Sequence, residues 1–144
     1  MDMAVQKHCD GVDPDNVDGY DNDNGLGLTQ NDSIAYMEYL ADAAHGRNLS
    51  IGLKNAGAIL SSVIDGMQWS VNEQCTQYQE CSTYAPFIKQ GKPVFHVEYP
   101  KGDDTNNANN VSAATQAKYC NDADASGFST ILKNIDLDSW IEAC

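Results

Sequence analysis

Short runs with strand character alternate with helical stretches along the whole chain, and this alternation restricts the fold more than any other feature. The strands are expected at 9–17, 49–54, 67–71, 93–99 and 127–132, with a polar loop at 103–107. The helices are expected at 29–46, with Thr29 or Asn31 as the cap, and at 58–64, 78–89, 113–119 and 137–143. Successive βα units predict a parallel sheet covered by helices. The fold class is therefore α/β, as either a doubly wound sheet or a (β/α)8 barrel.

Polar residues at the ends of the expected strands favour the barrel over the doubly wound sheet. They are Asp13, Asp15, Asn16, Lys54, Asn55, Asn72, Glu73, His96, Glu98, Lys133 and Asn134. In a barrel such side chains converge on the carboxyl-terminal face, where TIM barrels carry their active sites. A doubly wound sheet usually has a glycine-rich phosphate loop, and the candidate at 25–27 lacks its third glycine. Five units are fewer than eight, so we predict a partial (β/α)8 barrel of the TIM type whose first three units are missing.

The balance of charge restricts the partners. The chain has 8 basic and 21 acidic residues, which gives a formal net charge of −13. Nucleic acids and anionic membranes bind clustered cations, so this balance argues against both. A cationic partner fits, and so does a role of the acidic residues in solubility alone. No stretch reaches eighteen consecutive apolar residues, so no membrane-spanning helix is expected.

Three N-x-[ST] sequons and five cysteines are typical of an extracellular protein. Cys75 with Cys81 and Cys120 with Cys144 are the natural disulfide pairs, although four cysteines allow three connectivities and the sequence does not choose among them. Cys9 is left over. A metal site is less favoured because no C-x-x-C occurs and the three histidines are isolated. The amino-terminal residues lack the apolar core of a signal peptide.

Two carboxylates at strand ends match what glycosidic bond cleavage requires. Asp15 lies near the end of the first expected strand, and Glu73 lies at the end of the third. On alternate strands of a small barrel they would face each other across its mouth. One carboxyl group would then protonate the leaving oxygen, while the other attacks the anomeric carbon or directs a water molecule. The competing interpretation is a pair of solvated loop carboxylates, which is the commoner situation among 21 acidic residues.

Four ordered segments give the sequence a family resemblance. They are CDGVDPDNVDGY at 9–20, LSIGLKNA at 49–56, NEQC at 72–75 and PVFHVEY at 93–99. Together they closely resemble the second half of the fungal glycoside hydrolase family 114, the endo-α-1,4-polygalactosaminidases, and the resemblance runs from about residue 9 to residue 144. It implies that residues 1–144 are part of a catalytic (β/α)8 barrel and hold its strands four to eight.

The resemblance also implies a catalytic pair, an aspartate after strand four and a glutamate after strand six. Asp13 and Asp15 both qualify as the aspartate, and we choose Asp15 because the wider family pattern resembles D-G-V-x-x-D-x-x-D-x-Y, in which Asp13 falls on a variable position. Asp15 would be the nucleophile and Glu73 the general acid and base. The residues expected at substrate subsites are Asp13, Asn16, Asp18, Tyr20, Lys54, Asn72 and Glu98.

The substrate implied by the resemblance is an α-1,4-linked galactosamine polymer of the galactosaminogalactan type, a cationic polysaccharide that suits an acidic protein. The family implies secretion, with no cofactor and no metal. Family members carry about a hundred residues before the point at which this chain begins, so we expect a truncated barrel, whose exposed edges favour self-association. The rival hypothesis is a catalytically inactive secreted carbohydrate-binding fragment, or a truncated remnant of the enzyme.

Overall fold

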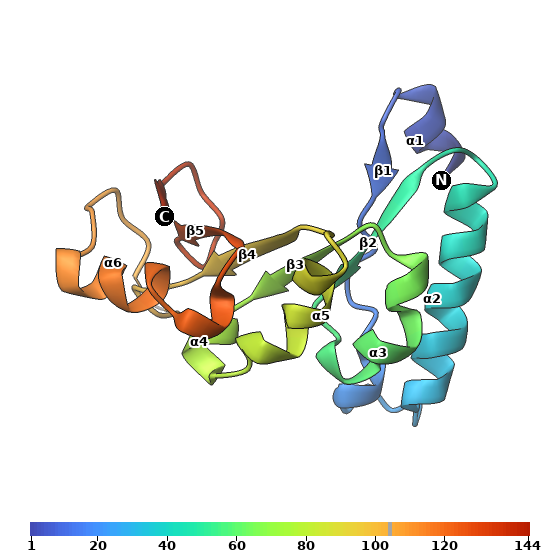
Figure 1. Cartoon of the computed structure of the whole chain (residues 1–144), viewed down its shortest axis with the longest axis horizontal. Coiled ribbons are helices and arrows are strands. Elements are labelled where there is room, and N and C mark those ends of the chain that lie inside the picture. The colour runs from blue at the N-terminus through green and yellow to red at the C-terminus, as the bar shows by residue number, and fades with distance from the viewer. Residues whose placement is uncertain (104) are drawn as a thin grey trace. The chain divides into compact units, whose positions relative to one another are not determined.

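The computed structural model describes residues 1–103 and 105–144, which form two compact units, Met1–Val71 and Asn72–Cys144 (Figure 1). Its strands are hydrogen-bonded in the order in which they follow along the chain, β1-β2-β3-β4-β5-β6. This mixed α/β sheet, dominated by parallel pairs, confirms the predicted fold class. The unit boundary falls inside β3 (Trp69–Glu73). Asp104, in the loop expected at 103–107, lies outside the described residues.

In the first unit, β1 (Gly11–Val12) pairs in parallel with β2 (Ser50–Lys54), and β2 pairs in parallel with β3. The helix α2 (Gln30–His45) packs against β2 and against α3 (Leu60–Val63) (Figure 1). The remaining helical segments are α1 (Asp2–Gln6), η1 (Gly19–Asp21), η2 (Gly57–Ile59) and η3 (Ile64–Gly66). The α2 helix therefore covers the strand that carries Lys54 at its carboxyl end.

The start of α2 is fixed by a capping box. The Thr29 hydroxyl accepts a hydrogen bond from the Asp32 N–H, and the Asp32 carboxylate accepts one from the Thr29 N–H at 2.8 Å. These contacts satisfy backbone donors that a helix start otherwise leaves unpaired. Met37, Ala41 and Ala44 are buried at helical spacing. The helix expected at 29–46 is therefore confirmed to within a residue at each end.

In the second unit, β4 (Val94–Glu98) pairs in parallel with β5 (Ser129–Lys133). The strand β6 (Ile141–Ala143) pairs with β5 in the antiparallel sense. The helical segments of this unit are α4 (Cys75–Tyr78), η4 (Cys81–Tyr84), α5 (Ala85–Lys89), α6 (Ala113–Cys120) and η5 (Ala123–Ala125). Two disulfides, Cys75–Cys81 and Cys120–Cys144, close this unit with the pairing expected from the sequence.

The closing helix expected at 137–143 is wrong, because the chain forms β6 there. Leu137 has a φ of 54°, in the left-handed region, which interrupts a right-handed helix at its first residue. The Cys144 N–H then donates to Thr130 O, which continues the pairing with β5 to the chain end. A second disulfide ties Cys144 to α6. Pairing with an available strand edge has thus overridden the apolar spacing of a short segment.

Two other expected elements are shorter than predicted. The strand expected at 9–17 is reduced to β1, because Pro14 lacks the N–H that a further ladder bond requires. The helix expected at 78–89 is divided into α4, η4 and α5. Its first break is at Gln79, which adopts a left-handed conformation, and Pro86 lies in the first turn of α5. Proline therefore starts a helix here instead of bending one.

Two glycines make room for Trp69 in the first unit. A Cβ added at Gly11 or at Gly52 would overlap the Trp69 indole, and the one at Gly52 would also lie 2.6 Å from Asp13 Oδ1. The indole therefore lies across β1 and β2 at the place where their side chains are missing. The glycines are required here for close approach, not for an unusual backbone conformation.

We predict that Gly52→Ala lowers the free energy of unfolding by about 1–3 kcal/mol, because the added methyl group forces Trp69 away from its position. Urea unfolding followed by tryptophan fluorescence measures the change. Gly66→Ala is the matched control, since its added Cβ would meet Ala41 Cβ at 3.5 Å, an ordinary contact. Equal stability of the Gly52→Ala and Gly66→Ala variants would contradict the prediction.

Candidate active site

In the first unit, Asp15 and Lys54 form an ion pair at the carboxyl ends of β1 and β2. Lys54 Nζ donates to Asp15 Oδ1 at 3.0 Å, and the Asn16 N–H donates to the same oxygen at 2.9 Å. The side chain of Lys54 is 14% exposed, whereas that of Asp15 is 62% exposed. The lysine is therefore held in the fold while the carboxylate stays accessible to a ligand.

These contacts lower the pKa of Asp15. The hydrogen bond from Lys54 is the largest cause, and the Asn16 N–H and the lysine charge act in the same direction, against a smaller opposing effect of burial. Asp15 therefore keeps its negative charge to a lower pH than an ordinary aspartate. An ionised carboxylate is the form that attacks an anomeric carbon or accepts a proton from water.

Asp13, two residues earlier, has the opposite character. Partial burial of its carboxyl group raises its pKa, the negative charge of Asp15 adds to the rise, and the charge of Lys54 and a hydrogen bond from Trp69 oppose it. Asp13 therefore binds a proton more readily than Asp15 does. The two candidate aspartates thus have different protonation behaviour although both follow β1.

The other predicted residues of this unit lie in the loop after β1. Asn16 has a φ of 57°, in the left-handed region that asparagine tolerates. The carbonyl oxygen of Asp18 accepts hydrogen bonds from the Asn22 side chain and from the Asp21 N–H. Partial burial and the charges of Asp18 and Asp21 raise the pKa of Tyr20, which is half-buried. Asn16 and Asp18 therefore shape the loop that carries Tyr20.

In the second unit, Glu73 is the last residue of β3 and its carboxylate accepts a hydrogen bond from a tyrosine. The donor is the hydroxyl of Tyr99, a buried residue that follows β4, and the acceptor is Glu73 Oε1. Tyr99 therefore orients the carboxyl group that we expect to act as the acid.

The backbone immediately after Glu73 is tied to β3 and β4. The Gln74 N–H donates to Val97 O at 2.8 Å, and the Cys75 N–H donates to Asn72 Oδ1 at 3.1 Å. Asn72 is almost completely buried. We expected it at a substrate subsite, and the structure shows its side chain bonded to the chain itself.

Glu98, also expected at a subsite, lies inside this unit. It is fully buried, and its Oε1 accepts hydrogen bonds from the N–H groups of Thr76 at 2.7 Å and Gln77 at 3.4 Å. His96, equally buried, places its Nε2 2.8 Å from the same oxygen. Glu98 is therefore a partner of the turn after Glu73.

A potential group of metal ligands lies beside Glu98, formed by Cys75, Cys81 and His96. His96 Nε2 is 3.3 Å from Cys75 Sγ. Both sulfur atoms belong to one disulfide, so neither is available as a thiolate, the form in which cysteine binds metal. In this state the group is a packed disulfide next to an imidazole.

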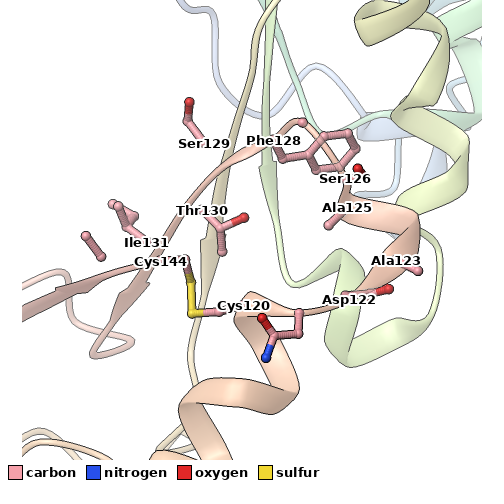
Figure 2. A pocket seen from close by; sticks show the side chains of 13 residues that line it. Cys120, Asp122, Ala123, Ala125, Ser126, Phe128, Ser129, Thr130, Ile131 and Cys144 are labelled. Carbon is pink, nitrogen blue, oxygen red and sulfur yellow. A yellow bond between two sulfur atoms is a disulfide. The ribbon is translucent and has the colours of Figure 1, made fainter.

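One hollow of the second unit contains none of the predicted catalytic or subsite residues. It measures about 710 Å³ and lies around the amino-terminal half of β5, next to the Cys120–Cys144 disulfide (Figure 2). A smaller hollow of about 390 Å³ includes Gln74 and Tyr99, which are adjacent to Glu73 in sequence or in contact with it. The smaller hollow is therefore lined by two residues that adjoin the predicted acid.

Carboxylates that follow parallel strands, as Asp15 follows β1 and Glu73 ends β3, are compatible with the class of glycoside hydrolases built on (β/α)8 barrels. The family model described as glycoside-hydrolase family GH114 matches residues 1–144, so the chain belongs to this family.

No helix among the described residues is long and apolar enough to cross a membrane.

One solved structure similar to this chain is that of Ega3 from Aspergillus fumigatus in complex with galactosamine. The two proteins are 64% identical with a TM-score of 0.96, and the match covers 99% of this chain and 57% of the Ega3 chain. This chain therefore spans somewhat more than half the length of that relative. Comparison with curated proteins gives no match.

Three contacts of the site were not predicted from the sequence. They are the hydrogen bonds from Tyr99 to Glu73 and from Trp69 to Asp13, and the engagement of Glu98 by backbone N–H groups. For Glu98 the sequence does hold one signal, the alternation of side chains along a strand. Glu98 and His96 are two residues apart, so they share a face of the strand. The other two depend on tertiary packing.

We predict that Lys54→Met raises the pKa of Asp15, because the substitution removes the hydrogen bond and the positive charge that lower it. Asp15 then takes up its proton at a higher pH than in the wild type. Carbon-detected NMR titration of the Asp15 carboxyl group measures the change. Lys7→Met, which removes the same charge at an exposed position after α1, is the control and leaves the titration of Asp15 in place.

Proposed function

We propose that this chain is the catalytic part of an endo-α-1,4-polygalactosaminidase, a hydrolase that cleaves α-1,4-linked galactosamine polymer with Asp15 and Glu73. The observation that carries the proposal is the position of the two carboxylates at the carboxyl ends of β1 and β3, in a chain of family GH114. The complex of Ega3 with galactosamine supports an amino sugar as ligand. Cleavage needs no metal or cofactor in this scheme.

The first step is transfer of a proton and formation of a glycosyl–enzyme bond. Glu73 gives its proton to the glycosidic oxygen, while the ionised Asp15 attacks the anomeric carbon as the bond to the leaving sugar breaks. The low pKa of Asp15 keeps this carboxylate ionised for the attack. In the second step Glu73, now ionised, takes a proton from water as the water oxygen displaces Asp15.

The acidic character of the chain suits a cationic substrate. A galactosamine polymer carries ammonium groups, and a chain of net charge −13 attracts such a polymer at long range. We propose that Asp13, Asn16, Asp18 and Tyr20 contact the sugar units from the loop after β1. The other three predicted subsite residues act indirectly. Lys54 hydrogen-bonds Asp15, while Asn72 and Glu98 accept hydrogen bonds from backbone N–H groups after Glu73. The extracellular space, where such polysaccharides accumulate, is the proposed location.

We predict that Glu73→Gln and Asp15→Asn each lower the release of reducing ends from polygalactosamine by about 10²-fold or more, because each removes one half of the chemistry. Asp13→Asn, which alters a proposed sugar contact but not the nucleophile, lowers the release much less than Asp15→Asn does and so discriminates between the two aspartates. Thermal unfolding of each variant checks that the fold persists.

The rival function, binding without cleavage, has a distinct outcome in the same experiment. In that case the wild-type chain sediments with the polymer but releases no reducing ends, and Glu73→Gln changes nothing. Loss of release in Asp13→Asn with full activity in Asp15→Asn would transfer the role of nucleophile to Asp13.

A further inference from the structure

The fully buried Glu98 holds the chain segment that begins immediately after Glu73. Its Oε1 accepts from the N–H groups of Thr76 and Gln77, at 2.7 and 3.4 Å, and lies 2.8 Å from His96 Nε2. Three polar groups therefore converge on one carboxylate oxygen.

The neighbouring residue in the chain, Tyr99, serves Glu73 from the other side. Consecutive residues of an extended chain point in opposite directions, so Glu98 and Tyr99 reach different faces of β4. Glu98 shares its buried face with Val94 and His96. The hydroxyl of Tyr99 binds the side chain of Glu73, whereas Glu98 binds the backbone that follows it.

The cost of burying Glu98 argues that it is retained for more than stability. Its second oxygen, Oε2, is buried and has no hydrogen-bond partner among the described residues. A buried polar atom without a partner costs free energy, and well-packed apolar side chains commonly stabilise such positions better than charges do. A carboxylate at this position therefore has a use that an apolar side chain lacks.

We propose that Glu98 is a positioning residue for catalysis: its Oε1 fixes the turn 74–77 and thereby the backbone from which Glu73 presents its carboxyl group. Glu98 itself touches no substrate. The Cys75–Cys81 disulfide closes the same turn, so the anchored segment is short and constrained. The inference rests on the proposed function, in which Glu73 is the acid and base. Small displacements of a catalytic group reduce rates strongly, which gives this anchor a kinetic effect.

The test compares Glu98→Leu, which removes the acceptor, with Glu98→Gln, which keeps an oxygen at Oε1. Val94→Ala is the matched control, a buried substitution at the opposite end of the same strand. Polygalactosamine hydrolysis gives kcat and KM, and hydrogen exchange gives the protection of individual amides. We expect Glu98→Leu to lower kcat about 10-fold or more with KM within about twofold, and to speed exchange at Thr76 and Gln77. Glu98→Gln keeps both properties near the wild type, and Val94→Ala lowers stability without lowering kcat.

Four results overturn the inference. The first two concern folded Glu98→Leu: an unchanged kcat, or unchanged exchange at Thr76 and Gln77. The third is a loss of kcat in Glu98→Gln as large as in Glu98→Leu while both amides stay protected. The fourth is a loss of kcat in Val94→Ala equal to that in Glu98→Leu. If Glu98→Leu does not fold, Glu98→Gln decides alone: fast exchange with a normal kcat contradicts the inference, and slow exchange with a normal kcat supports it. Failure of the proposed function gives a different result. The wild type then hydrolyses no more polygalactosamine than Glu73→Gln does, while hydrogen exchange at Thr76 and Gln77 still tests whether Glu98 holds the turn.

Discussion

The alternation of side chains along β4 is the constraint on which the second unit depends. Val94, His96 and Glu98 are buried on one face, while Tyr99, the next residue, reaches Glu73. The dipeptide Glu98-Tyr99 therefore contacts both the side chain of Glu73 and the backbone after it. A shift of one residue in the register with β5 would exchange the two faces and break both contacts. The geometry of the predicted acid thus follows from strand register.

In the first unit, environment separates two aspartates that the sequence treats almost alike. Lys54 lowers the pKa of Asp15, and burial raises the pKa of Asp13. A nucleophilic carboxylate must be ionised, and of the two aspartates Asp15 is the one whose surroundings favour the ionised form. The family pattern and the electrostatics thus favour Asp15 as the ionised partner by independent arguments. Trp69, which donates to Asp13, lies over Gly52, so this difference also depends on a missing side chain.

The sequence predicts those parts of the structure that local interactions determine. The cap residue Thr29 and the apolar spacing of α2 are local features of the sequence, and β2 is a buried run between turns. The β6 strand was missed because its pairing with β5 is antiparallel and non-local, and its short apolar run is equally compatible with a helix. For Glu98, the sequence shows a polar residue at a strand end but not the two N–H groups that its carboxylate accepts from. Residue type is visible in the sequence, whereas partners belong to the tertiary structure.

Charge acts in this chain on two length scales with different consequences. Among the eight basic residues, Lys54 is paired with Asp15 and Lys101 lies over the Trp140 ring, 3.2 Å from its centre. Such contacts act over a few ångströms, whereas the net charge of −13 sets the sign of the long-range field. That field falls off over about 10 Å at moderate salt and recruits cationic polymers without selecting a bond. Selection of a bond requires contacts of hydrogen-bond length, and these are made by Asp15 with Lys54 and by Glu73 with Tyr99. In the proposed function the acidic composition therefore serves substrate capture, and the local pairs serve the chemistry.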